Sequence, residues 1–203
     1  MRSVAGKTGR SRHGSVHPVQ TGSPGATPSA GAAGNGRSGR LDTLPSQRWL
    51  DVGCGEGKTE GAIGMDRRAV PGVDIVHDIE AVPWPFEDAT FTRIIMSHVV
   101  EHLKPWLVID IFNEMWRLLK PAGILMIATP YAGSFGFWQD PTHTKGWIEA
   151  TPSYFDPEHA SGLYGIYKPK PWQIVVNSWH ADGNMEICLK KRSVNEKPAR
   201  RNV

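Results

Sequence analysis

A short apolar segment that ends in an acid and runs into a glycine-rich loop constrains this chain more than any other feature. Residues 48–52 read as a buried strand with Asp51 near its end, and Gly53, Gly55 and Gly57 follow. Glycine at every second position lets backbone N–H groups approach a ligand, because no Cβ stands in the way. The pattern indicates a site for a nucleotide-type cofactor.

Two familiar phosphate-binding loops do not match this segment. A P-loop requires a glycine five residues before its Gly-Lys pair, and Val52 stands at that position relative to Gly57-Lys58. The dinucleotide fingerprint requires a third glycine that lets a helix pack closely on the strand. Lys58 occupies that place, because Gly57 comes one residue early. A glycine-rich surface turn is the plainest alternative to a cofactor loop.

The segment resembles the cofactor loop of class I S-adenosylmethionine-dependent methyltransferases, where a strand, an acid and three spaced glycines follow one another. The run from Asp51 to Asp66 is similar to a compact subgroup of small bacterial and viral methyltransferase domains, and the resemblance extends over about residues 47–192. It implies an α/β fold, a Rossmann-like three-layer sandwich with a mostly parallel seven-stranded sheet and an antiparallel C-terminal hairpin. It also implies S-adenosyl-L-methionine as the cofactor.

Two further apolar segments, 62–66 and 74–78, read as strands that end in Asp66 and Asp78. Ligands bind beyond the carboxyl ends of parallel strands, so these acids and Asp51 are expected at one edge of the sheet. Only eight residues separate the last glycine of the loop from Asp66, so the first helix must be reduced to a turn or absent.

In the resembling family the second acid accepts hydrogen bonds from both ribose hydroxyls, and the third contacts the adenine amino group. The cofactor-binding residues that the resemblance implies are Asp51, Gly53, Cys54, Gly55, Gly57, Asp66, Asp78, Ile79 and Ser97.

A histidine-rich segment follows the predicted fourth strand, residues 91–96. Its sequence from His98 through Glu101 to His102 matches the inverted zinc-protease signature. That site needs both histidines on one helical face, whereas this segment follows a buried strand and Pro105 marks where the next helix begins. No metal is therefore expected. The resemblance places a Ser-His-x-x-Glu-His run over the cofactor, which makes His98 and His102 candidate bases or substrate clamps. A hydrogen-bonded structural histidine is the alternative for each.

The clearest helix spans residues 105–120, where apolar side chains recur at i, i+3 and i+4. These are Val108, Ile111, Phe112, Met115, Leu118 and Leu119. Pro121-Ala122-Gly123 is expected to end the helix, and 123–130 is predicted as the fifth strand. Residues 172–176 and 185–189 are predicted to form a closing hairpin around Asp182-Gly183, a turn signal.

The segment 131–167 is long and aromatic, and long loops of this kind usually serve a function. We interpret it as a lid or pocket wall over the transferable methyl group, with Asp140 and His143 as candidates for proton removal. The alternative is a packed loop that its histidine only holds in place.

The net charge of +3 conceals basic ends on an acidic centre. Residues 1–40 carry six basic residues and no acid, residues 190–203 carry six basic residues and one acid, and the remainder has 11 basic and 19 acidic residues. Residues 1–46 contain almost no large apolar side chain and are predicted to be disordered. The expected organisation is a basic tail (1–46), a methyltransferase domain (47–192) and a second basic tail (193–203).

The rest of the composition narrows the function. Cys54 and Cys188 do not suggest a disulfide framework or a zinc site, and neither a secretory signal nor an apolar run of ~20 residues is present, so a cytoplasmic location is expected. The acidic centre favours methylation of an oxygen or nitrogen of a small molecule, sugar or lipid precursor. A non-catalytic binding module is one alternative. A nucleic-acid methyltransferase that docks through its basic tails is the other, and the oligomeric state is left open.

Overall fold

The structure is a computed structural model that describes residues 48–193. These residues belong to the larger of two units of the chain, Leu41–Val203. The predicted N-terminal tail (1–46) and nearly all of the predicted C-terminal tail (193–203) lie outside the described residues.

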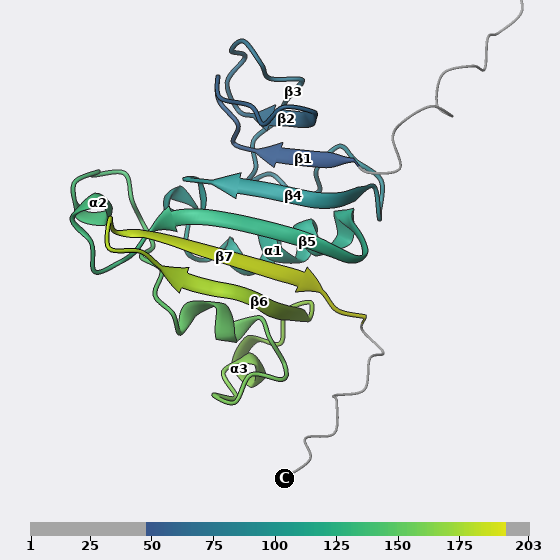
Figure 1. The fold of residues 1–203 in the computed structure, drawn as a ribbon. Helices are drawn as coiled ribbons and strands as arrows, with labels where there is room; N and C mark the ends of the chain where they lie inside the picture. Colours follow the sequence, from purple (N-terminus) through teal and green to yellow (C-terminus); the bar gives the residue numbers. More distant parts are fainter. Residues whose placement is uncertain (1–47, 194–203) are drawn as a thin grey trace, which may run out of the picture. The chain divides into compact units, whose positions relative to one another are not determined.

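A seven-stranded mixed sheet with the order β3-β2-β1-β4-β5-β7-β6 forms the centre of the domain (Figure 1). The strands are β1 (Trp49–Val52), β2 (Ala62–Asp66), β3 (Ile75–Val76), β4 (Phe91–Ser97), β5 (Leu119–Pro130), β6 (Trp172–Trp179) and β7 (Asn184–Lys191). The first five pair in parallel, whereas β7 pairs antiparallel with both β5 and β6. The predicted parallel sheet with an antiparallel C-terminal hairpin is confirmed.

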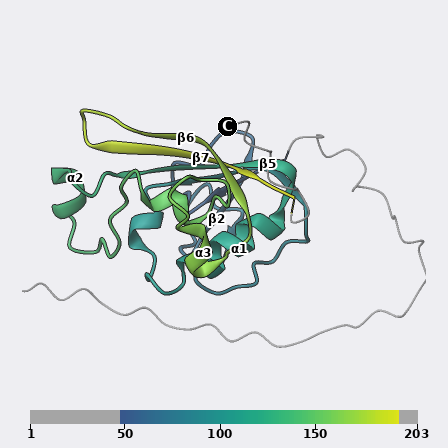
Figure 2. The ribbon, with the colours of Figure 1, turned by 90° about the horizontal axis from the view of Figure 1, so that it is seen from below.

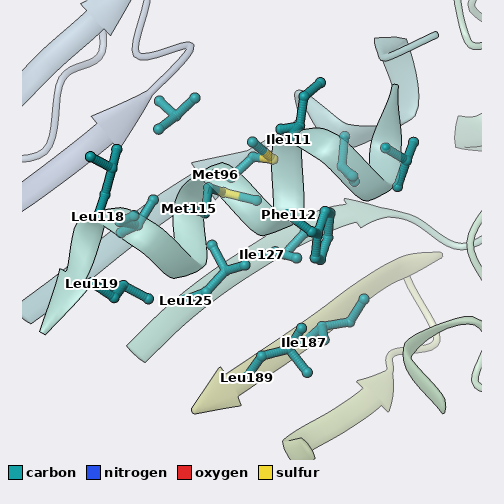
Figure 3. Packing of buried hydrophobic residues seen from close by; sticks show 14 of the residues in the cluster. Met96, Ile111, Phe112, Met115, Leu118, Leu119, Leu125, Ile127, Ile187 and Leu189 are labelled. Carbon is teal, nitrogen blue, oxygen red and sulfur yellow. The ribbon is translucent and has the colours of Figure 1, made fainter. Parts of the chain in front are cut away.

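The core lies between the sheet and helix α1 (Val108–Leu118), as Figure 3 shows. The helix buries the apolar stripe predicted from its spacing, and β5 alternates so that Leu125 and Ile127 are buried while Met126 is 41% exposed. The labelled residues of this core are Met96, Ile111, Phe112, Met115, Leu118, Leu119, Leu125, Ile127, Ile187 and Leu189. The buried side chains of β4, β5 and β7 therefore lie on the face of the sheet that α1 covers.

The remaining helical segments are short: η1 (Val100–His102), α2 (Phe135–Trp138), η2 (Thr151–Tyr154) and α3 (Tyr164–Tyr167). Figure 2 shows α1 and α3 on the same side of the strands β5, β6 and β7. No helix within residues 48–193 is long and apolar enough to cross a membrane.

Several element boundaries differ from the prediction, and helix α1 spans Val108–Leu118 rather than residues 105–120. β5 begins at Leu119, directly after α1, and its register against β4 shifts between Phe91 and Arg93. Pro121-Ala122-Gly123, which was expected to end the helix, therefore lies within β5. It forms an irregular turn there, in which Ala122 has φ +60°. β3 contains only two residues, so Asp78 lies beyond its end. The hairpin strands are longer than expected, because each continues past the apolar residues that predicted it.

The link between β1 and β2, residues 53–61, contains turns and no helix, in agreement with the predicted loss of the first helix. Because this link is short, the carboxyl ends of both strands lie beside the glycine loop. Gly53 N–H donates to the carbonyl of Met65 in β2 at 2.7 Å, which ties the start of the loop to the second strand.

Candidate active site

The glycine loop is shaped by backbone conformations that glycine adopts readily. Gly53 has φ +70° and Gly55 has φ +52°, in the left-handed region that other residues rarely adopt. A Cβ on Gly53 would also collide with the side chain of Val99, in the segment after β4. The loop therefore packs directly against the histidine-rich segment.

The three strand-end acids do not share one role. The Asp51 carboxylate is buried and accepts the backbone N–H of Thr59 at 2.7 Å, so it closes the glycine loop. Asp66 accepts the N–H of Gly55 through Oδ2 at 2.9 Å and the N–H of Arg68 through Oδ1 at 2.9 Å. Asp78 accepts the N–H of Glu80 at 3.0 Å. Asp66 and Asp78 face a cleft, whereas Asp51 does not line it.

Burial alone would raise the pKa of Asp66. The hydrogen bonds from the Arg68 backbone, the Arg68 side chain and the Gly55 backbone outweigh that effect, and the pKa of Asp66 is lowered. The group is therefore an ionised carboxylate at neutral pH, which can only accept hydrogen bonds.

The cleft beside Asp66 has a volume of about 610 Å³, within the usual range for small-molecule sites. Of the predicted cofactor-binding residues, Gly53, Asp66, Asp78 and Ile79 line it. The others do not line it: Asp51, Cys54, Gly55, Gly57 and Ser97 belong to the glycine loop and to the ends of β1 and β4. Its further lining residues are Arg67, Arg68, Glu80, His98, Val99, His102, Leu103, Lys104, Thr142 and Thr144.

A second cleft, of about 580 Å³, is also lined by residues of the histidine-rich segment. All four predicted catalytic residues line it: His98, His102, Asp140 and His143. His98 and His102 also line the first cleft, so the two clefts adjoin at this segment.

His98 is held in an unusual conformation at the end of β4. Its φ is +54°, and its N–H donates to the carbonyl of Ala128 at 2.8 Å. Its Nδ1 lies 3.4 Å from Oε1 of Glu101, whose side chain is 1% exposed. The left-handed turn ends the strand and directs the chain into η1, which carries Glu101 and His102.

His102 is connected to Asp140 through the hydroxyl of Thr142. The Thr142 hydroxyl donates to Asp140 at 2.7 Å and lies 3.0 Å from Nδ1 of His102. A hydroxyl has one proton to donate, and Asp140 receives it. Nδ1 of His102 is therefore placed to donate to the Thr142 hydroxyl. The hydrogen bonds from Thr142 lower the pKa of Asp140, so Asp140 orients Thr142 as an ionised carboxylate.

His143 meets His102 edge to face, with ring centroids 4.7 Å apart. Its Nδ1 lies 2.7 Å from the carbonyl of Phe137, a pure acceptor, so this nitrogen also carries a proton. The structure thus brings together all four predicted catalytic residues, from segments about 40 positions apart.

The profile of a protein family described as "Methyltransferase domain" matches residues 31–167, more than half of the chain. This chain belongs to the S-adenosylmethionine-dependent methyltransferase domain family.

A curated relative agrees with that assignment. A Mycolicibacterium smegmatis protein named as an S-adenosylmethionine-dependent methyltransferase is 30% identical over 118 residues, which cover 47% of this chain and 44% of that protein. The chain thus spans less than half the length of this curated relative.

Among solved structures, a SAM-dependent methyltransferase from Archaeoglobus fulgidus is similar with 20% identity and a TM-score of 0.51, over 71% of this chain and 86% of that chain. The cyclase SpnF is similar with 16% identity and a TM-score of 0.51, over 72% of this chain and 74% of that chain. These two likenesses show the class I methyltransferase fold alone, and one fold can serve different reactions.

The family implies S-adenosyl-L-methionine as cofactor, and the first cleft of the methyltransferase suits it. Two carboxylates, Asp66 and Asp78, can accept hydrogen bonds from hydroxyl and amino groups, and Ile79 and Leu103 add apolar surface. Gly53 leaves free the space that a Cβ would occupy beside Val99.

The aromatic segment 131–167 is only partly a lid. Trp147 is fully buried and stacks on Phe112 of α1, and Phe155 stacks on the same ring from a centroid distance of 4.3 Å. Only residues 136–144 of this segment border the clefts. Phe135 and Trp138 of α2, beside the second cleft, are 80% and 76% exposed.

Sequence reasoning missed several cleft residues. Arg68 and Lys104 border the first cleft because each pairs with an acid nearby, Arg68 with Asp66 and Lys104 with Glu80 at 2.6 Å. Arg68 could have been predicted from the sequence, because it stands two residues after Asp66. Thr142 could not, because its contact with His102 depends on two segments meeting in space.

Proposed function

We propose that this methyltransferase moves a methyl group from S-adenosyl-L-methionine to an oxygen or nitrogen atom of a small-molecule, sugar or lipid-precursor acceptor. The cofactor occupies the cleft beside Asp66, and the acceptor occupies the cleft beside His143. The observation that carries the proposal is that His98 and His102 line both clefts.

Methyl transfer is a displacement in which the acceptor atom forms a bond to the methyl carbon as the bond from that carbon to the sulfonium sulfur breaks. The protein's main contribution is alignment of acceptor, methyl group and sulfur. A hydroxyl or ammonium acceptor must also lose a proton. We assign its removal to the histidines where the clefts meet, because a neutral imidazole nitrogen can receive it.

The character of the second cleft favours a neutral or cationic acceptor. Glu101, Asp140 and Asp182 line it, whereas no lysine or arginine is among its lining residues in the described part of the chain. Nucleic-acid binding depends on basic side chains that neutralise phosphates. The exposed rings of Phe135 and Trp138 add apolar surface beside the cleft, which suits a sugar ring or a lipid chain.

We place the catalytic domain at residues 47–192, with 1–46 and 193–203 as basic tails. The described residues that line the clefts run from Gly53 to Asn184, and this supports the boundaries.

Calorimetric titration of the full-length chain tests the cofactor half of the proposal. S-adenosylmethionine and S-adenosylhomocysteine should bind with micromolar dissociation constants, whereas NAD and ATP should not bind. Asp66→Ala should abolish binding of the first two without loss of the folded state by circular dichroism.

An acceptor screen tests the other half. The protein is incubated with S-adenosylmethionine and panels of hydroxylated, amino and polyanionic acceptors, and release of S-adenosylhomocysteine is measured. Turnover with small acceptors supports the proposal. Cofactor binding without turnover on any panel would favour the binding module, and turnover only on nucleic acid would favour the tail-docked enzyme.

A further inference from the structure

Three potential metal-binding side chains meet in the acceptor cleft. Glu101 and His102 come from η1, after β4, and His143 comes from the segment after α2. One potential ligand atom from each lies within 4.8 Å of the other two. The arrangement joins two parts of the chain about 40 residues apart.

Glu101 carries a buried oxygen that lacks a hydrogen-bond partner. Its side chain is 1% exposed, and only Oε2 is satisfied, by the Thr129 hydroxyl at 3.1 Å. Oε1 is buried without a hydrogen bond, and the nearby Nδ1 of His98, at 3.4 Å, does not form one. An unsatisfied buried carboxylate oxygen is unfavourable, and a cation would satisfy it.

Both imidazole rings are already oriented from behind. His143 directs Nδ1 to the carbonyl of Phe137, and His102 directs Nδ1 to the hydroxyl of Thr142, which Asp140 orients in turn. Histidine ligands of metals usually donate their second ring N–H to a carbonyl, carboxylate or similar acceptor. With Nδ1 of each ring engaged, Nε2 is the nitrogen that each histidine has left for a metal ion, which binds neutral imidazole.

We propose that Glu101, His102 and His143 bind a divalent transition-metal ion, with Zn²⁺ as the reference ion. Two imidazoles and one carboxylate match the three-ligand set of catalytic zinc sites, which leave a further position open. Imidazole ligands favour zinc and its neighbours over magnesium or calcium. Because zinc–nitrogen distances are about 2.0–2.1 Å, the ligand atoms would draw together by up to about 1.5 Å.

Glu101, His102 and His143 all line the acceptor cleft, so a bound ion would offer its open position to an acceptor hydroxyl there. This role rests on the proposed function, whereas metal binding itself does not. With His102 bound to the ion, His98 is the one of the two proposed bases that would remain to receive the acceptor's proton.

The proposed site differs from the inverted zinc-protease signature that the sequence from His98 to His102 matches, because both histidines of that signature bind zinc. Here one histidine of the motif binds, and the third ligand is His143 from a distant segment. The spacing of the motif does not predict this third ligand, because His143 meets His102 only through tertiary packing.

The test uses tag-free full-length protein, stripped of metal with a chelator and titrated with Zn²⁺ by calorimetry and by competition with a chromogenic chelator. One ion per chain is expected, and excess Mg²⁺ should not displace it. Glu101→Gln and His143→Ala should each weaken Zn²⁺ binding at least 100-fold. His77→Ala is the matched control, because His77 lies outside both clefts, and should bind Zn²⁺ as the unaltered chain does.

Circular dichroism and cofactor titration establish that each variant is folded. Absence of stoichiometric Zn²⁺ binding, or equal binding by the His143→Ala and His77→Ala variants, would overturn the metal site. Methyl transfer at full rate by metal-free protein would remove its catalytic role and leave the proposed function intact. Stoichiometric binding that depends on Glu101 and His143, without turnover on any acceptor, would uphold the site while the proposed function fails.

Discussion

Arg68 donates from Nε to Oδ1 of Asp66 at 3.2 Å, and both residues line the cleft that we assign to the cofactor. Asp66 accepts three hydrogen bonds within the chain, from Gly55 N, Arg68 N and Arg68 Nε. A carboxylate has about four acceptor positions, so a ribose that uses two of them displaces the Arg68 side chain. That side chain is 60% exposed and free to move.

Asp66→Asn should therefore weaken S-adenosylmethionine binding at least tenfold, which corresponds to about 1.4 kcal/mol. Arg68→Ala should leave the affinity unchanged or raise it, because it removes a competitor for Oδ1. Calorimetric titration of both variants with S-adenosylmethionine tests the two predictions. Asp74→Asn is the control, since Asp74 pairs with Lys58 and does not line the cleft. A large loss of affinity in the Arg68 variant would show that the guanidinium itself contacts the cofactor.

Gly53→Ala should abolish cofactor binding and lower stability. The new methyl group would collide with Val99, which lines the cleft, and the left-handed backbone adds strain. Gly61→Ala separates the two effects, because Gly61 also has a positive φ, +76°, but a Cβ there meets no atom within 4 Å. Thermal unfolding and cofactor titration of both variants are the measurements. Equal cofactor affinity in the two variants would mean that the contact with Val99 is unimportant.

The sequence predicted the sheet well because apolar periodicity and strand-end acids are local signals. Residues 62–66 form β2 as predicted, and the stripe of α1 is buried as expected. The start of β5 was wrong by four residues, because a strand can continue through an irregular turn when its neighbour, here Phe91, offers a partner.

The site was less predictable, because its residues meet through tertiary packing. The contact between His102 and His143 depends on how residues 131–144 return to the sheet, where Tyr131 forms an isolated bridge with Trp147. No spacing rule gives that path. The same packing places Trp147 and Phe155 in the core, so aromatic content alone did not distinguish a lid from the interior.

Thr142→Val should reduce methyl transfer about 10- to 100-fold while leaving S-adenosylmethionine affinity within about threefold. The substitution keeps the shape of the side chain but removes the hydroxyl that connects His102 to Asp140. Thr142→Ser restores the hydroxyl and should restore the rate. Turnover kinetics of the two variants provide the comparison, and equal rates would show that the connection is structural only.

The environment of Glu114 leads to a prediction about how the stability of the fold depends on pH. Its carboxylate accepts Trp84 N–H at 2.7 Å and pairs with Arg117, away from both clefts. Burial alone would raise its pKa, but the hydrogen bonds from Arg117 and Trp84 outweigh burial and lower it. A carboxyl whose folded-state pKa is lowered stabilises the fold above its unfolded pKa, and this contribution disappears as the pH falls through the folded value.

Glu114→Gln should therefore unfold more easily in urea at neutral pH, by roughly 1–3 kcal/mol. The difference from the unaltered chain should shrink as the pH falls below about 4. Comparing the two proteins at each pH cancels the titration of their other carboxyls. A difference independent of pH would mean that the charge of Glu114 does not contribute.

The basic tails offer a way to decide between a small acceptor and nucleic acid. Residues 1–40 and 190–203 carry 12 basic residues against one acid, and contacts between such residues and phosphates weaken steeply with salt. If the acceptor is small, deletion of residues 1–40 should leave the turnover and its salt dependence unchanged, because the described cleft residues proposed to bind it run from Gly53 to Asn184. If nucleic acid is the acceptor, the deletion should raise the KM for it and flatten the salt dependence. Initial rates of the full-length and shortened chains over a range of salt concentrations distinguish the two outcomes.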